Sequence, residues 1–470
     1  IRYFYEGGRV TLDFALQHKI QHFIRRLTPI QSLVIIYFVA VIIGIIMLGL
    51  PWSTKGDYNW DFTDLVFMAV SCVSVTGLTT VSVSETFTTF GYFMIMILVQ
   101  VSGIGLMSLH IAMWVILGKR IGFRERQLVV RDQNQTTMQG VVKYIREVIL
   151  IIVSIELIGA LILGLYYTKY FPTLGEAMLQ GLFGSVSATT NAGFDITGES
   201  LLPFRGDLFV VFMQILLLTL GAIGFPVLVE VRRYISYRAT RQATRQPYHF
   251  SLFTKLTAST FFILVLFGTV SLLLFEWNQS FKGLPVDEKL VDALFQSVTT
   301  RNGGLTTVDI TSFSQASIFV LSLLMFIGAS PSSVGGGIRT TTFAVAVLSV
   351  IAFIRGEYGI KIFGREIGQS DIWKAFVVIV VSTGVTMVGL IVLLLVEDAP
   401  FLVLFFEACS AFGTTGLSLG ITDQLSDVGK WTLSVLMFIG RIGVISFVLL
   451  LKANQPKRNY NYPKESVIIG

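Results

Sequence analysis

Charged residues are scarce in this chain, and their scarcity excludes an ordinary soluble domain. Only 14% of the 470 residues are Asp, Glu, Lys or Arg, whereas 53% are hydrophobic, and the mean hydropathy is +0.73. Soluble domains carry about 25% charged residues. The composition therefore predicts a polytopic membrane protein, in which lipid covers much of the surface.

Cysteine and histidine are also scarce, which argues against a disulfide scaffold and a metal-dependent enzyme. The two cysteines, Cys72 and Cys409, lie in apolar segments, and we interpret them as small packing residues without a disulfide. The four histidines do not cluster, and the pair His18 and His22 has no further ligand nearby in the sequence. No catalytic triad, phosphate-binding glycine-rich motif or paired-carboxylate site stands out. We therefore expect no enzymatic activity and no nucleic-acid partner.

Long apolar runs, in contrast, are plentiful, and a membrane span needs about 20 such residues. The predicted spans lie near residues 32–50, 91–117, 147–167, 208–231, 253–275, 316–354, 373–396 and 431–451. An even number of spans places both ends of the chain on one side of the membrane. Most Lys and Arg residues lie in the terminal segments and in alternate loops, so the positive-inside rule predicts that both termini are cytoplasmic.

Four short segments of the chain resemble one another. They read SVTGL (Ser74–Leu78), TNAGF (Thr190–Phe194), RNGGL (Arg301–Leu305) and GTTGL (Gly413–Leu417). Their shared glycines recur at intervals of 116, 111 and 112 residues, at positions Gly77, Gly193, Gly304 and Gly416. Such a repeat allows four equivalent loops to close around one axis.

Each of these loops follows an apolar segment that is too short to cross a bilayer. The segments cover about residues 61–74, 176–189, 289–300 and 400–412. They predict re-entrant half-helices, and their acidic starts suit helix N-termini. Their C-terminal ends, which carry negative partial charge, would then point at the axis and favour a cation there.

The loops themselves predict an ion-selectivity filter. Non-helical backbone inside a membrane is tolerated where it lines a water-filled path, and its carbonyl oxygens can replace the hydration shell of an ion. The candidate filter residues, which offer their main-chain oxygens to K⁺, are Ser74, Val75, Thr76, Gly77, Thr190, Asn191, Ala192, Gly193, Arg301, Asn302, Gly303, Gly304, Gly413, Thr414, Thr415 and Gly416.

The third long span contains the sequence GASPSSVGGGIRTTT (Gly328–Thr342), which cannot hold a straight helix. We interpret the break as a movable gate below the filter, and the alternative is a static kink. The stretches around Gly103, Gly221 and Gly440 align with it and are expected to remain helical. The candidate gate residues are Gly328, Ala329, Ser330, Pro331, Ser332, Ser333, Val334, Gly335, Gly336, Gly337 and Arg441.

Arginines in the apolar regions need partners, because a charge in a span is costly, and Arg339 and Arg441 both lie inside predicted spans. Arg441 follows Gly440 in the fourth repeat, and we expect it to hydrogen-bond the carbonyls of the gate loop. Arg301 lies within the third filter loop. We expect its side chain to point away from the axis, toward Asp292 or Glu407.

These motifs together resemble the superfamily of potassium transporters that includes the bacterial KtrB and TrkH proteins and the plant HKT proteins. The resemblance covers about residues 30–452 and rests on the four glycine loops, on MFIGASPSSVGGGIRTTT (Met325–Thr342) and on MFIGRIGV (Met437–Val444). Eight spans fit the KtrB-like membrane subunit better than TrkH, which carries extra N-terminal spans.

The resemblance implies an all-α membrane protein of four M1–pore helix–M2 repeats, with eight transmembrane helices and four re-entrant half-helices around one pseudo-fourfold pore. The corresponding boundaries are 1–30 for a cytoplasmic arm, 31–118, 147–235, 253–354 and 372–452 for the four repeats, and 453–470 for a cytoplasmic tail.

The resemblance also implies K⁺ uptake across the cell membrane. Glycine at all four filter positions accompanies K⁺ preference in the family, whereas Ser at the first position accompanies Na⁺ selectivity in some plant relatives. KtrB-like proteins form homodimers on a cytoplasmic octameric ring of KtrA-like subunits, which binds ATP or ADP, and Na⁺ often activates transport. The alternative function is Na⁺ or non-selective cation transport by the same fold.

Overall fold

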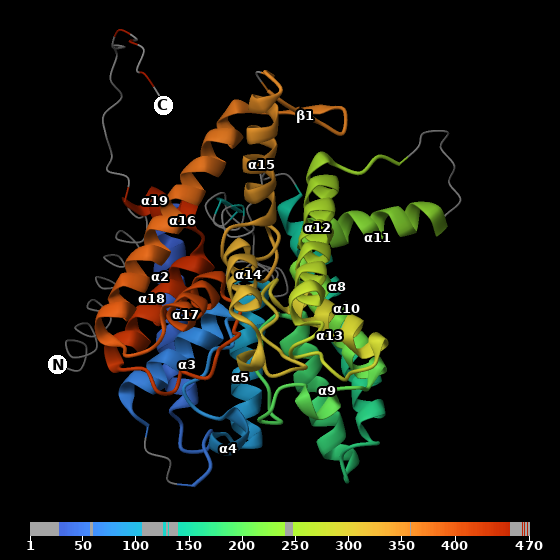
Figure 1. The fold of residues 1–470 in the computed structure, drawn as a ribbon. Helices are drawn as coiled ribbons and strands as arrows, with labels where there is room; N and C mark the ends of the chain where they lie inside the picture. Colours follow the sequence, from blue (N-terminus) through green and yellow to red (C-terminus); the bar gives the residue numbers. More distant parts are fainter. Residues whose placement is uncertain are drawn as a thin grey trace, which may run out of the picture.

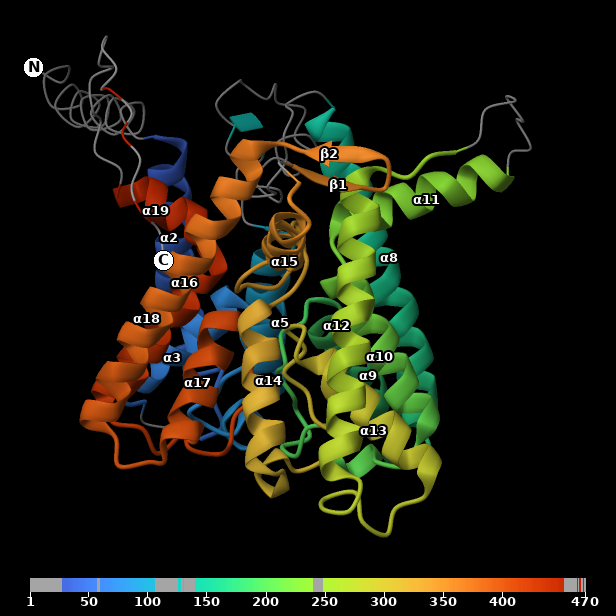
Figure 2. The ribbon, with the colours of Figure 1, turned by 45° about the horizontal axis from the view of Figure 1, so that its top comes forward.

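The computed structural model describes residues 28–56, 60–105, 126, 127, 130, 140–239, 248–357, 359–451, 463, 465 and 468. Most of the predicted N-terminal arm (1–30), the first repeat beyond residue 105 and most of the C-terminal tail (453–470) lie outside the described residues. The described chain is mainly helical (Figure 1, Figure 2). We call the end that carries the β-hairpin of β1 (Ile360–Ile362) and β2 (Arg365–Ile367) the hairpin end, and the opposite end the short-helix end.

The longest apolar helices are α2 (Pro29–Leu48), α8 (Val141–Tyr167), α12 (Leu252–Glu276) and α16 (Gln369–Val396). With 20 to 28 residues each, they are about 30–42 Å long, which is sufficient to cross the hydrocarbon core of a bilayer. Only 28 to 44% of their most apolar windows is buried inside the molecule. Large apolar side chains such as Phe38 and Leu395 face outward. This surface is typical of a helix that contacts lipid.

Each long helix is followed by a short helix that packs against it: α3 (Phe62–Ser74), α9 (Leu174–Thr189), α13 (Val286–Thr299) and α17 (Phe401–Gly413). With 13 to 16 residues, none of the four crosses a bilayer. Their C-terminal parts are deeply buried; in α17 every residue from Leu404 to Gly413 is buried. The short helices therefore end inside the molecule, as the repeat pattern predicts.

A third set of helices completes the pattern: α5 (Thr89–Ile104), α10 (Leu208–Ala222), α14 (Gln315–Ile327) and α18 (Asp427–Ile442). Turns and short helices lead into them, namely α4 (Val83–Thr86) and the 3-10 helices Leu202–Phe204 and Ile310–Ser312. The largest apolar cluster joins α3, α5, α17 and α18 through side chains such as Phe67, Leu98 and Phe412. This core fixes the positions of the short helices.

All four helices of the third set are followed within two residues by a glycine with positive φ: Gly105 (98°), Gly224 (101°), Gly328 (55°) and Gly443 (89°). In the third repeat, α14 and α15 (Thr340–Ile354) are separated by Gly328–Arg339, so the predicted break is present. A glycine tolerates this backbone conformation, and any other residue there is strained.

The expectation of continuous helices in the second and fourth repeats is wrong. After Gly224 the chain turns by 105° into α11 (Phe225–Ala239), and after Gly443 it turns by 98° into α19 (Val444–Leu451). Figure 2 shows α11 running sideways at the hairpin end. The predicted spans 208–231 and 431–451 are therefore each two helices with a sharp bend.

At the short-helix end, contacts tie each long helix or the segment after it to the start of the third-set helix. The Glu276 carboxylate at the end of α12 accepts hydrogen bonds from the backbone N–H and the hydroxyl of Ser314, at 2.9 and 2.6 Å, and Ser314 caps α14. Glu397 accepts the same pair from Ser426, which caps α18. In the first repeat, the Thr88 hydroxyl donates to the Trp52 carbonyl oxygen.

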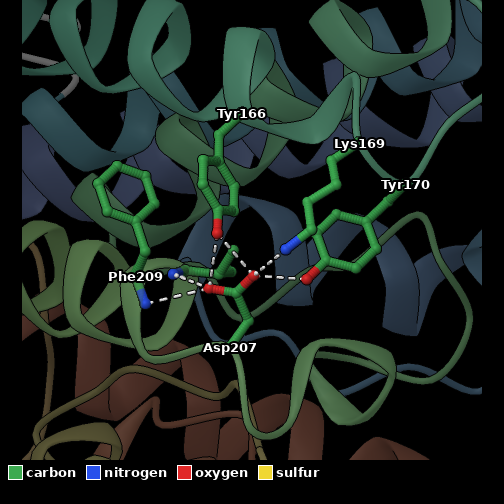
Figure 3. A network of polar contacts seen from close by, with 6 residues as sticks. Tyr166, Lys169, Tyr170, Asp207 and Phe209 are labelled. Atoms are coloured by element: carbon green, nitrogen blue, oxygen red, sulfur yellow. Dashed lines mark hydrogen bonds and ion pairs between the residues drawn. The ribbon is translucent and has the colours of Figure 1, made fainter.

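In the second repeat the carboxylate lies at the start of the third-set helix, and the donors come from the end of the long helix and the segment after it (Figure 3). Asp207 caps α10, and its carboxylate accepts hydrogen bonds from the hydroxyls of Tyr166 and Tyr170 at 2.9 and 2.5 Å. Lys169 lies 3.6 Å from the same carboxylate and above both tyrosine rings. These ties hold the short-helix end together in every repeat.

Candidate ion pathway

The loops that follow the four short helices come together in one ring. A Cβ atom added at Gly77 would collide with the carbonyl oxygen of Ala192, next to Gly193. A Cβ atom added at Gly193 would lie 2.8 Å from the Cα atom of Gly304. The first loop therefore contacts the second, and the second contacts the third, with no space for a side chain between them.

The other two contacts close the ring. A Cβ atom added at Gly304 would lie 2.6 Å from the carbonyl oxygen of Thr415, and one added at Gly416 would collide with the carbonyl oxygen of Thr76. The fourth loop thus returns to the first. The structure brings together the four glycines that the sequence repeat singles out.

The four loops share one backbone conformation. The residue two positions before each glycine has a positive φ, namely Val75 (57°), Asn191 (51°), Asn302 (73°) and Thr414 (52°). The glycines also have positive φ, from 68° to 91°. Left-handed conformations are rare for branched side chains such as Val and Thr, and they persist only where the surroundings hold them.

The loop amides bond back to the short helices. The amide N–H groups of Thr76, Ala192 and Thr415 donate to carbonyls five residues earlier, at 2.7 to 2.9 Å, while Gly303 donates to Thr299 at 2.6 Å. Among the described residues, no hydrogen bond reaches the carbonyl oxygens of Val75, Thr76, Gly77, Asn191, Ala192, Gly193, Asn302, Gly303, Gly304, Thr415 and Gly416. Such oxygens remain available as ligands for a cation.

Side-chain hydrogen bonds from two asparagines join neighbouring loops. The sequence analysis did not single out these side chains. The Asn191 amide donates to the Arg301 carbonyl oxygen at 3.2 Å, joining the second loop to the third. The Asn302 amide donates to the carbonyl oxygens of Gly413 and Thr414, joining the third loop to the fourth. Both side chains are almost fully buried.

The predicted gate residues form a buried loop directly against the ring. The Gly336 amide N–H donates to the Thr414 hydroxyl at 2.8 Å, which connects the gate loop to the fourth filter loop. A Cβ atom added at Gly335 would collide with the Asn302 side chain, so the gate loop also contacts the third filter loop.

The gate loop reaches the first and second repeats as well. Its Ser330 amide donates to the Ala222 carbonyl oxygen at 3.1 Å, and its Ser332 carbonyl accepts from the Phe225 amide at 2.8 Å. The Val334 side chain lies 3.3 Å from a Cβ atom placed at Gly103 in α5. One loop therefore contacts elements of all four repeats.

Arg339, rather than Arg441, holds the gate loop. The Arg339 guanidinium donates to the carbonyl oxygens of Ser330 and Gly335, at both sides of the loop. The predicted hydrogen bonds from Arg441 to the loop are absent among the described residues, and its guanidinium donates to the Ser102 carbonyl oxygen of α5 instead. The backbone of Gly440 faces the loop, since its carbonyl oxygen lies 3.0 Å from a Cβ atom placed at Gly336.

The predicted partners of Arg301 are also wrong. Its fully buried guanidinium donates to the carbonyl oxygens of Leu324 and Gly328, at the end of α14 and the start of the gate loop. Carbonyls at a helix C-terminus lack intrahelical partners and carry negative partial charge, so they satisfy a cation. Asp292 pairs with Arg205 at 3.0 Å, and Glu407 accepts from Ser418 and other groups beyond the fourth filter loop.

A cavity of about 350 Å³ opens beside the ring, and the described residues of its wall include none from the gate loop. Its wall includes Gly77 and Gly416 from the ring, and Thr80, Ser418 and Asp423 from the segments after it. The Ser418 hydroxyl donates a hydrogen bond to the Glu407 carboxylate at 2.6 Å. The wall of this cavity therefore offers hydroxyl groups and the Asp423 carboxylate beside the ring.

Comparison with known proteins identifies the family of this chain. The sequence profile of the TrkH family, described as a cation transport protein, matches residues 16–462. The Ktr system potassium uptake protein D of Bacillus subtilis (strain 168) is 48% identical over 447 residues, with 95% of this chain and 98% of that protein covered. The Ktr system potassium uptake protein B of the same strain is 38% identical over 95% of this chain and 97% of that protein.

A third relative and one solved structure extend the comparison. The potassium/sodium uptake protein NtpJ of Enterococcus hirae is 32% identical, over 95% of this chain and 98% of that protein. The crystal structure of the potassium transporter TrkH from Vibrio parahaemolyticus has the same fold, with a TM-score of 0.67 at 19% identity, and covers 89% of this chain and 83% of its own. With a family match over nearly its whole length and several apolar helices able to cross a bilayer, this chain is a multi-pass membrane protein of the TrkH family of cation transport proteins, which are ion transporters and not enzymes.

Proposed function

We propose that this chain takes up K⁺ across the cell membrane through the ring formed by its four glycine loops. The proposal rests on the closed ring of contacts between the four loops. It also rests on the loop carbonyl oxygens that accept no hydrogen bond from the described residues. The glycines at the contacts are Gly77, Gly193, Gly304 and Gly416. These oxygens replace the hydration shell of K⁺, and the C-terminal ends of α3, α9, α13 and α17 add favourable partial charge. The printed names of the Ktr relatives support K⁺ as the substrate.

The proposal includes the repeat architecture. Each quarter consists of a long helix, a short re-entrant helix, a filter loop and a third helix, and the four quarters surround one pseudo-fourfold pore. We assign the filter to the backbone oxygens of the loop residues and the gate to the loop Gly328–Gly337. The gate loop contacts all four repeats, so it lies across the path of an ion that leaves the ring.

The positive-inside rule gives the orientation of this proposal. The basic residues Arg232, Arg233 and Arg238 of α11 lie at the hairpin end, so this end and both termini face the cytoplasm. The cavity beside Gly77 and Gly416 then faces outward, and Asp423 there attracts cations. An ion passes the filter before it meets the gate loop.

The proposal extends to partners by resemblance to the Ktr proteins. The chain forms a homodimer, and a cytoplasmic octameric ring of KtrA-like subunits binds ATP or ADP and switches the gate, with Na⁺ as an activator. The word "system" in the relatives' names supports a multi-component transporter. Mass measurement of the purified complex tests the stoichiometry, and flux with and without Na⁺ and nucleotide tests the regulation.

Na⁺ or non-selective cation transport is the second candidate, because the relative NtpJ is named as a potassium/sodium uptake protein. Rb⁺ uptake into proteoliposomes that contain this chain, with K⁺, Na⁺ and Li⁺ as competitors, separates the two. Saturable uptake that K⁺ blocks and excess Na⁺ does not block supports K⁺ selectivity, and equal block by Na⁺ supports the alternative. Absence of uptake, even after the cytoplasmic partner is added, contradicts the filter assignment.

A further inference from the structure

Thr414 joins the gate loop to the fourth loop of the filter ring by a hydrogen bond, and Arg301 of the third loop separately donates to the Gly328 carbonyl oxygen. Its hydroxyl accepts a hydrogen bond from the Gly336 amide at 2.8 Å and one from the Asn302 amide at 3.0 Å. The Thr414 backbone carbonyl also accepts from Asn302, at 2.9 Å. All of these groups are buried, so water does not substitute for a lost partner.

The hydroxyl is not needed for the conformation of the loop. Val75 occupies the equivalent position in the first loop, and its backbone has φ 57° and ψ 50°, against 52° and 50° for Thr414. Valine and threonine differ in shape by very little. The two remaining equivalents are the asparagines Asn191 and Asn302, so the fourth loop is the one of the four that offers a hydroxyl here.

A donor from the gate loop lies opposite this hydroxyl. The gate loop belongs to the third repeat and approaches the fourth filter loop through Gly336 and Gly337. A Cβ atom added at Gly337 would lie 3.2 Å from the Cα atom of Gly413. When the gate loop moves away, the Gly336 bond must break. The Thr414 hydroxyl then keeps only its bond with Asn302 among the described residues, while the Thr414 amide N–H still donates to the Ala411 carbonyl oxygen at 3.1 Å.

We infer that the Thr414 hydroxyl couples the gate loop to the fourth filter loop, so that the position of the gate and the geometry of the filter change together. The inference rests on the proposed function and names a positioning residue within it. Because coupling free energies are reciprocal, an ion that stabilises the fourth filter loop also stabilises the closed gate.

Rb⁺ uptake into proteoliposomes tests the inference with three single variants. Thr414→Val removes the acceptor of the Gly336 amide and is expected to raise uptake about three- to tenfold, the population shift that one buried hydrogen bond produces. Thr414→Ser keeps the hydroxyl and is expected to stay nearer the wild type. Thr386→Val is the matched control, because Thr386 is almost as deeply buried, lies in α16 and has a hydroxyl that bonds to none of the described residues.

A second measurement separates coupling from a local effect on the filter. In a protein that lacks Ser333–Gly337, the donor at Gly336 is gone, so Thr414→Val is expected to have no further effect on uptake. Equal increases in both backgrounds, or unchanged uptake of Thr414→Val in the full chain, would overturn the inference. If Thr414→Val does not insert correctly, Thr414→Ala makes the same comparison, and wild-type protein without any Rb⁺ uptake contradicts the proposed function itself.

Discussion

The filter ring and the gate loop are adjacent, but they are held in place by different kinds of contact. In the ring, backbone atoms of neighbouring loops touch at glycines, and there is no space for a Cβ atom. In the gate loop, a small number of hydrogen bonds from Gly336, Phe225 and Arg339 hold a segment that has no regular secondary structure. The ring is therefore specified mainly by backbone contact at its glycines, with added hydrogen bonds from two asparagines, whereas the gate loop depends more on single hydrogen bonds. Substitutions in the ring should therefore abolish discrimination between K⁺ and Na⁺. Substitutions at the gate loop should instead shift the equilibrium between its closed and open positions and so change the rate of uptake.

The largest effect is expected for Gly193→Ser. The new Cβ atom would lie 2.8 Å from the Cα atom of Gly304, and φ is 68°, so two loops must separate. We expect discrimination between K⁺ and Na⁺ to fall by tenfold or more, a ratio that corresponds to about 1.4 kcal/mol. Rb⁺ uptake with increasing Na⁺ as the competitor measures the change.

A matched control separates the clash from backbone strain alone. Gly56 has a similar φ of 63°, but no atom of the described residues beyond its chain neighbours lies within 4 Å of a Cβ atom placed there. Gly56→Ser is expected to retain ion discrimination. If Gly193→Ser discriminates as well as Gly56→Ser, the ring contact does not determine selectivity.

Removal of Ser333–Gly337 from the gate loop should have the next largest effect. The deletion takes away the bond to Thr414 and the contact of Val334 with α5, so the barrier beneath the ring is lost. We expect uptake to rise by about tenfold with K⁺ still preferred over Na⁺, because the ring glycines are untouched. An equal or lower rate in correctly inserted protein would mean that the loop is a scaffold rather than a barrier.

A smaller effect is expected for Arg339→Gln. This change removes the charge that bonds both sides of the gate loop, and uptake should rise about threefold to tenfold. Arg441→Gln is the matched comparison, because Arg441 bonds α5 and not the loop, so its effect on uptake should be smaller. Uptake assays of the two variants side by side would contradict this assignment if Arg441→Gln gave the larger increase.

The smallest effect concerns stability rather than transport. Burial alone would raise the pKa of Asp207, but hydrogen bonds from Tyr170, Tyr166 and two amide N–H groups lower it below its usual value of 3.8. A carboxylate with a lowered pKa stabilises the fold above its usual pKa, and this contribution is lost as the pH falls through the lowered value. Asp207→Ala also removes the cap of α10, so we expect a loss of about 1–2 kcal/mol in the free energy of unfolding at pH 7.

Thermal unfolding in detergent at several pH values checks this prediction. The difference in Tm between the wild type and Asp207→Ala should be constant near neutral pH and shrink below about pH 4. Lys169→Met serves as the control, because the Lys169 side chain is 63% exposed and its ion pair should contribute little. A difference that grows at low pH would contradict the assigned direction of the pKa shift.

The sequence predicts the parts of this molecule that depend on repetition and on local composition. The spacing of Gly77, Gly193, Gly304 and Gly416 identifies the loops that meet, and the run of glycines at 335–337 predicts a break in the third long span. Short apolar segments before each loop predict the short helices to within a few residues. The loops and the short helices repeat four times, so each occurrence strengthens the interpretation of the others.

The features that the sequence does not predict depend on contacts between distant segments. A single glycine in an apolar run is compatible with a continuous helix or a bend, so the turns at Gly224 and Gly443 cannot be chosen from composition. The partners of Arg301 and Arg441 are backbone carbonyls of other helices, and carbonyls leave no mark in the sequence. The role of Arg339 could have been predicted, because an arginine beside the glycine run needs hydrogen-bond acceptors, and the gate loop offers them nearby.

The ring is made by one covalent chain, and this has a consequence for how its quarters can differ. A ring of four identical subunits would carry the same side chain at all four equivalent positions, and four copies of the gate loop would compete for the same space beneath it. In a single chain, each duplicated quarter diverges separately, so Val75, Asn191, Asn302 and Thr414 share a backbone conformation but have different partners. Fusion of the quarters is therefore what permits a ring of four similar loops to be contacted by a single buried loop that belongs to one quarter only.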